Sequence, residues 1–167
     1  MIEKIKNNIK YIMFLAAFVS IGLVIPSIFG LFSSEITDTS IISLLYYAGI
    51  ILTNIFILIM ANKKIEEINI TIPLLLICIA KIISYVNGIM NNQYINLVYI
   101  GLYLSILILQ FIKCNKKALF ALYILLVLAI SFTILNVFTG SQLGLASLIC
   151  LSMIFLIIYL QKGKGEE

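Results

Sequence analysis

Residues 72–90 read IPLLLICIAKIISYVNGIM, and this stretch decides the fold class of the chain. Only Lys81 in it carries a formal charge, and most of the other residues are apolar. At about 1.5 Å of rise per residue, a helix of this length reaches about 28 Å, close to the hydrocarbon thickness of a bilayer. The segment is therefore predicted to be a membrane-spanning helix.

Five further runs of similar length and composition occur in the sequence. The six predicted spans are residues 11–32, 41–61, 72–90, 94–112, 118–138 and 143–161. The connecting loops are short, so consecutive helices are expected to be antiparallel neighbours, with Ser40 and Thr71 as N-caps of the second and third. The predicted fold is an all-α integral membrane protein, a six-transmembrane-helix bundle forming a single domain over residues 1–167.

The overall composition agrees with a lipid environment. Apolar residues make up 63% of the chain, charged residues 11%, and the mean hydropathy is +1.19, whereas about a quarter of the residues of a soluble domain are charged. The run 11–32 is longer than the apolar core of a signal peptide and is expected to remain as the first span. The abundance of Ile, Asn and Lys is typical of an AT-rich bacterial genome, so the predicted location is a bacterial cytoplasmic (inner) membrane.

The distribution of lysines predicts the orientation. Ten of the eleven lysines lie before span 1, between spans 2 and 3, between spans 4 and 5, or after span 6. Loops that carry Lys or Arg stay on the cytoplasmic side, so both termini are expected in the cytoplasm. The net charge of +4 is thus a topology signal, and no nucleic-acid partner is expected.

Several residue types needed for catalysis are missing from the predicted spans. The sequence has no histidine, no span contains Asp or Glu, and Cys78, Cys114 and Cys150 fit neither a disulfide framework nor a metal-binding spacing. No catalytic residue, metal or cofactor is therefore predicted, and the chain is expected not to be an enzyme. A Ser–Lys mechanism on Lys81 and Ser84 is the enzymatic alternative.

Lys81 lies near the predicted midplane of the bilayer, where a lysine costs roughly 2.5 to 3.5 kcal/mol. Three explanations remain open from the sequence. The side chain extends toward the cytoplasmic surface, it occupies a polar cavity inside the bundle, or it pairs with an acidic group on another subunit.

Polar side chains recur at helical spacing in three spans, which supports the cavity. The three stripes are Lys81, Ser84, Tyr85 and Gly88 in span 3; Asn96, Tyr99, Tyr103 and Gln110 in span 4; and Ser43, Tyr46, Tyr47, Thr53 and Asn54 in span 2. Such faces are expected to turn inward, because polar groups facing lipid are costly. The predicted ligand-binding residues are Lys81, Ser84, Tyr85, Tyr103, Tyr47 and Asn54. Hydrogen bonding between helices without any ligand is the alternative.

Two functions from different classes are compatible with these features. The first is a non-enzymatic substrate-capture or transport component with a polar midplane site around Lys81. In size and topology the chain is similar to the substrate-binding subunits of energy-coupling-factor vitamin transporters, and Ala16 with Ser20 forms a small-xxx-small pair like that family's docking surface. The resemblance implies a further membrane or cytoplasmic subunit as partner.

The second function is an oligomeric membrane interaction protein. It would be a pore former, a bacteriocin immunity protein or a phage-defence membrane subunit that works by self-association or with a cytoplasmic partner.

Overall fold

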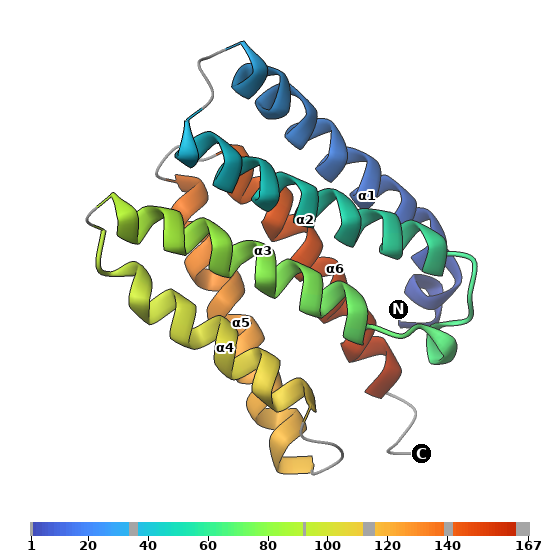
Figure 1. Cartoon of the computed structure of the whole chain (residues 1–167). Coiled ribbons are helices and arrows are strands. Elements are labelled where there is room, and N and C mark those ends of the chain that lie inside the picture. Colours follow the sequence, from blue (N-terminus) through green and yellow to red (C-terminus); the bar gives the residue numbers. More distant parts are fainter. Residues whose placement is uncertain (1, 34–36, 92, 112–115, 139–141, 163–167) are drawn as a thin grey trace.

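The computed structural model describes residues 2–33, 37–91, 93–111, 116–138 and 142–162 (Figure 1). These residues form α1 (Ile2–Phe32), α2 (Asp38–Met60), the single-turn η1 (Ile65–Glu67), α3 (Thr71–Met90), α4 (Asn96–Phe111), α5 (Lys116–Phe138) and α6 (Gln142–Lys162). The all-helical prediction is confirmed. Five helices are long and apolar enough to cross a membrane, and α4 is a shorter apolar helix.

The helix ends agree with the predicted spans to within three residues except at the start of α1, which begins at Ile2 instead of residue 11. The predicted N-caps are both displaced. Thr37 caps α2 in a capping box with Ser40, through reciprocal bonds of 3.3 Å between each backbone N–H and the other side chain. At α3, the backbone N–H of Thr71 donates to the Asn69 side chain at 2.9 Å. Helix α2 therefore starts two residues before Ser40, and in α3 Thr71 is the first helical residue, with Ile70 at the N-cap position.

The six helices close into a ring, because each packs on the next and α1 packs on α6. Helix α6 also contacts α2 and α3. More than half of its apolar segment, 56%, is buried, against at most 39% for the other long helices. It is the central helix of the described bundle, and Figure 1 shows it behind α2 and α3.

One end of the bundle is closed by an apolar cluster. It is formed by Ile9, Met13 and Ala17 of α1, Ile57, Met60 and Ala61 at the end of α2, Ile65 and Ile68 around η1, and Met153, Ile157 and Leu160 of α6. The amide nitrogen of Gln161 donates to the carbonyls of Ile65 and Ile68, both at 2.8 Å, and ties η1 to α6. We call this end, which carries Lys10, Lys63 and Lys64, the lysine-rich end. The start of α1 and the end of α6 lie there together (Figure 1).

Candidate functional site

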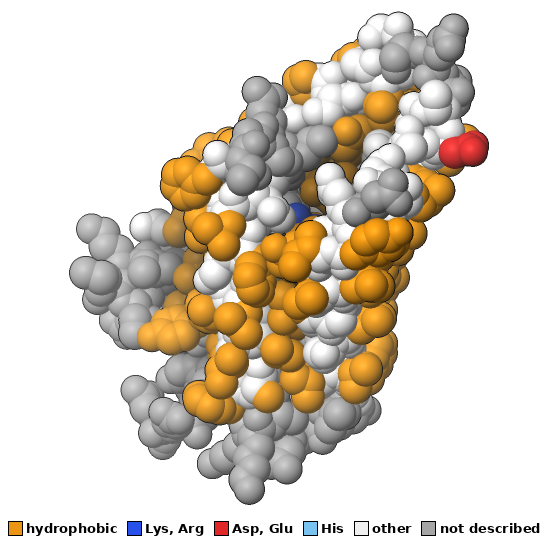
Figure 2. All heavy atoms as spheres, turned by 90° about the vertical axis from the view of Figure 1, so that its left-hand side faces the viewer, with side chains coloured by type: hydrophobic (Ala, Val, Ile, Leu, Met, Phe, Trp, Pro, Cys, Tyr) orange, Lys and Arg blue, Asp and Glu red, His pale blue; other side chains and the backbone are white. Residues whose placement is uncertain are grey.

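A cavity of about 280 Å³ lies at the other end of the bundle, which we call the lysine-poor end. The early turns of α2 and α6, the late turns of α3 and α5, and the α3–α4 turn enclose it. The lining residues are Ser43, Tyr46, Tyr47, Lys81, Ser84, Tyr85, Gly88, Gln93, Asn96, Asn136 and Gly144. Figure 2 looks onto this side of the molecule and shows a recess in which basic side-chain atoms are visible. Lys81 is the lysine that lines the cavity.

Lys81 is almost fully enclosed, with 4% of its surface exposed. Its ammonium nitrogen lies 5.7 Å from the centre of the Tyr85 ring, one turn toward the C-terminal end of α3. Among the described residues, the ammonium has neither an ion pair nor a hydrogen-bond partner. The first of the three explanations, in which the Lys81 side chain extends toward the start of α3, does not fit this geometry. The side chain instead faces the cavity.

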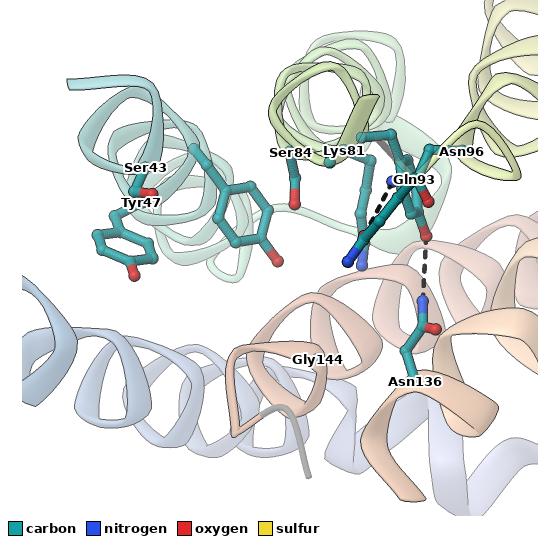
Figure 3. Close-up of a pocket in the computed structure, with 11 residues that line it drawn as sticks. Ser43, Tyr47, Lys81, Ser84, Gln93, Asn96, Asn136 and Gly144 are labelled. Carbon is teal, nitrogen blue, oxygen red and sulfur yellow. Dashed lines mark hydrogen bonds between the residues drawn. The ribbon is translucent and has the colours of Figure 1, made fainter. Parts of the chain in front are cut away.

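Tyrosine rings and one amide form the wall beside Lys81. Tyr85 stacks on Tyr99 of α4 with ring centres 4.9 Å apart and lies 5.9 Å from the ring of Tyr103. The Asn136 amide of α5 donates to the Tyr85 hydroxyl at 3.3 Å. Figure 3 shows Asn136 reaching from α5 toward α3, while Lys81 and Ser84 extend from α3 into the space between them. Three helices thus meet around the ammonium.

The α3–α4 turn forms the rim of the cavity. The backbone N–H of Gln93 donates to the Gly88 carbonyl at 3.0 Å, and the Asn96 amide donates to the Gln93 side chain at 3.4 Å. A Cβ at Gly88 would collide with the Asn96 amide. The absence of a side chain at Gly88 therefore allows Asn96 to lie across the turn.

Four of the six predicted binding residues line the cavity, namely Lys81, Ser84, Tyr85 and Tyr47. Figure 3 places Tyr47 at the edge of the cavity, away from Lys81. Tyr103 is 1% exposed and lies behind Tyr85, with its hydroxyl 3.5 Å from that of Thr133. It is not among the lining residues, and its hydroxyl lies beside Thr133 of α5.

Asn54 belongs to a separate polar cluster deeper in the bundle. Its amide nitrogen donates to the Ser20 hydroxyl and to the Ile50 carbonyl, both at 2.9 Å. The Cys150 thiol donates to its oxygen at 3.5 Å. This cluster joins α1, α2 and α6, and all three of its side chains are buried. The cluster therefore connects these three helices.

Seven lining residues were not among the six predicted binding residues. Four of them belong to the polar stripes, namely Ser43, Tyr46, Gly88 and Asn96, whereas Gln93, Asn136 and Gly144 belong to no stripe. Asn136 carried a usable signal, because an amide in an otherwise apolar span must find a polar partner. Gln93 lies in the α3–α4 connection, and Gly144 carries no polar side chain. Helical periodicity could not assign either of them to a face.

The lining offers one cation, several hydroxyls and several amides. Among the described residues that line it there is no carboxylate, and within the described ranges no three His, Cys, Asp or Glu side chains are grouped as metal ligands would be. Such a surface can donate hydrogen bonds to a polar solute and balance a negative charge.

No protein-family model matches the chain, and comparisons with curated proteins and with solved structures give no match. The function is therefore inferred from the geometry and chemistry of the cavity.

Proposed function

We propose that the chain is a small multi-pass protein of a bacterial cytoplasmic membrane, a non-enzymatic transport-related component that captures a small solute in the cavity at Lys81. One observation carries the proposal. The Lys81 side chain is 4% exposed and lines the cavity, and no partner for its ammonium is found in the described part of the chain. A charge with little access to water is costly until a partner offsets it, which favours a site that is completed by a bound molecule.

The outer surface supports insertion in a bilayer. Large apolar side chains exposed on the outside of the bundle include Leu15, Phe18, Phe29, Ile59, Ile108 and Phe120. Figure 2 shows hydrophobic side chains covering much of one face. In water such a surface would drive aggregation, whereas lipid tails cover it at no cost.

The orientation follows from the lysine rule applied to the two ends. With the lysine-rich end in the cytoplasm, both the start of α1 and the end of α6 are cytoplasmic, and the cavity faces the outside of the cell. Beneath Lys81 the bundle is filled by buried side chains from five helices, among them Ile50, Ile77, Ile106, Ala129 and Ile154. A solute would therefore reach Lys81 from the outer side.

Capture fits this geometry better than a pore. A ring of subunits with Lys81 facing a common axis requires the lysine to lie on the outside of each subunit, whereas Lys81 is enclosed within one chain. A stable ring-shaped oligomer that binds no solute would instead favour the interaction-protein alternative.

The test is a solute screen on purified protein in lipid nanodiscs, with thermal unfolding as the readout. Ser84→Leu fills the cavity without removing the charge, and Ser131→Leu places the same side chain on the exposed face of α5. We expect at least one small polar solute to raise the unfolding midpoint of the wild type and of Ser131→Leu but not of Ser84→Leu. Solutes that stabilise all three proteins equally, or a screen without any stabilising solute, would contradict capture.

A further inference from the structure

We propose that the solute held at Lys81 is a small monoanionic carboxylate whose other polar groups carry no charge. This inference rests on the proposed capture function and adds the chemical class of the ligand. It is carried by the charge balance of the cavity, by the position of Ser84 and by the cavity volume.

The charge balance selects one negative charge. Lys81 is the charged residue of the lining, and the described acidic residues Asp38 and Glu67 are exposed at the ends of the bundle. Charges in an environment shielded from water are stable only when they are paired. A monoanion makes the filled site neutral. A dianion leaves one negative charge without a partner among the described lining residues, and an amino acid brings an ammonium for which the described lining offers no carboxylate.

The arrangement of Lys81 and Ser84 fits a carboxylate. They are three residues apart on α3, a spacing that places two side chains side by side on one face of a helix. Figure 3 shows both side chains extending into the same space. The ammonium can donate to one carboxylate oxygen and the Ser84 hydroxyl to the other, and hydrogen bonds to an ionised group are the stronger kind.

The rest of the cavity limits the size and character of the ligand. Its volume of about 280 Å³ lies just below the usual range of small-molecule pockets. Tyr46, Tyr85 and the amides of Gln93 and Asn96 present ring faces and neutral polar groups to it. These surfaces suit a compact body with apolar and neutral polar parts, attached to the carboxylate.

The experiment compares compounds that share one skeleton and differ in charge. One series is benzoate, benzamide, 4-(aminomethyl)benzoate and terephthalate, and the other is butyrate, butyramide, 4-aminobutyrate and succinate. Each is titrated into wild type, Lys81→Met and Lys63→Met in nanodiscs, and the apparent Kd is taken from the shift of the unfolding midpoint. Lys63 is the matched control because it is an exposed lysine at the far end of the bundle.

We expect at least one of the two monocarboxylates to bind the wild type, and its neutral, zwitterionic and dianionic counterparts to bind at least about tenfold more weakly. Lys81→Met should abolish this preference, and Lys63→Met should retain it. Ser84→Ala, which keeps the charge of Lys81, should weaken binding of the monocarboxylate while leaving the order of the four compounds unchanged.

Equal or tighter binding of an amide, amino acid or diacid would overturn the monoanion assignment. The same holds if the preference for the monocarboxylate survives in Lys81→Met, or if neither monocarboxylate binds. The two proposals fail separately. A neutral or zwitterionic solute whose binding is lost in Ser84→Leu leaves capture standing and removes the ligand class. If no compound binds in either experiment, both the capture proposal and the ligand class are wrong.

Discussion

The ammonium nitrogen of Lys81 lies 5.7 Å from the centre of the Tyr85 ring, and the two residues occupy successive turns of one face of α3. A desolvated cation over an aromatic ring gains about 2 kcal/mol, whereas a lysine at the bilayer midplane costs roughly 2.5 to 3.5 kcal/mol. The ring therefore offsets only part of the cost of burying the charge. Under the capture proposal, a bound anion would offset the rest.

The contact between Lys81 and Tyr85 can be measured by a double-mutant cycle. Tyr85→Phe keeps the ring and loses the hydroxyl that accepts from Asn136, while Tyr85→Leu removes the ring. We expect the difference in unfolding free energy between these two variants to be about 0.5 to 2 kcal/mol smaller in a Lys81→Met background, since the ring then has no cation to stabilise. An identical difference in both backgrounds would show that the ring acts only through its packing on Tyr99.

Replacing the charge itself should stabilise the ligand-free protein. Lys81→Met keeps the length of the side chain and removes the ammonium, which has no partner among the described residues. The free energy of unfolding should therefore rise by about 1 to 3 kcal/mol in nanodiscs without added solute. Lys63→Met should change it by less than about 0.5 kcal/mol, as is usual for an exposed position. A clear loss of stability in Lys81→Met would mean that the ammonium already has partners in the ligand-free protein.

Gly88 and Gly101 form a matched pair for testing the rim of the cavity. A Cβ at Gly88 meets the Asn96 amide, whereas a Cβ at Gly101 of α4 meets nothing within 4 Å. Gly88→Ala should weaken solute binding, because the Asn96 amide must move, and should cost less than about 1 kcal/mol of stability, because that amide is the end of a flexible side chain. Gly101→Ala should be neutral or stabilising by about 0.5 to 1 kcal/mol. Chemical denaturation of both variants measures the contrast, and equal effects would show that the turn yields without cost.

The cluster of Ser20, Asn54 and Cys150 should contribute to stability and leave ligand specificity unchanged. Asn54→Leu removes the acceptor of the Cys150 thiol and the donor to Ser20, for an expected loss of about 0.6 to 1.7 kcal/mol on membrane hydrogen-bond scales. Its effect should be non-additive with Ser20→Ala and additive with Ser152→Ala, which lies on the exposed face of α6. Loss of the preference for monoanions in Asn54→Leu would instead place this cluster in the binding site.

The orientation can be tested by labelling single cysteines in intact cells with a membrane-impermeant maleimide. In a cysteine-free background, Gln93→Cys at the lysine-poor end should react from outside, and Asn62→Cys at the lysine-rich end should react only after lysis. Both positions are exposed. The lysine pattern also predicts external labelling at positions 34, 92 and 141 and no external labelling of Cys114, four positions that lie outside the described residues. External reaction at Asn62→Cys would reverse the topology.

The number and limits of the helices could be predicted because they follow from local composition. Each apolar run is bounded by lysines, amides or turn residues, so five starts and six ends agree with the spans to within three residues. The start of α1 differed because a helix continues through charged residues beyond the apolar run that was taken as the span. The N-cap of α2 differed because Thr37 and Ser40 can both cap, and the reciprocal bonds of a capping box favour the earlier residue.

The site could be predicted only in part, because periodicity defines a face of a helix and not its neighbours. Lys81, Ser84 and Tyr85 share a stripe, and they line one cavity. Tyr103 and Asn54 also belong to polar stripes, yet each finds a partner, Thr133 or Ser20, on a helix that the pattern could not identify. Asn136 reaches the cavity from α5 and donates to Tyr85 of α3, an approach of two helices that the stripes alone could not indicate.

The apolar cluster at the lysine-rich end has a consequence for energetics across the membrane. Met13, Met60 and Met153 fill the described interior between α1, α2 and α6 below the cavity. Under the proposed function and orientation, a molecule at Lys81 would exchange with one compartment only, and its occupancy would follow the concentration in that compartment. Such a protein cannot by itself build or dissipate a gradient. Net uptake would require work supplied from the opposite face, applied where Gln161 holds η1 against α6, to separate the methionine side chains.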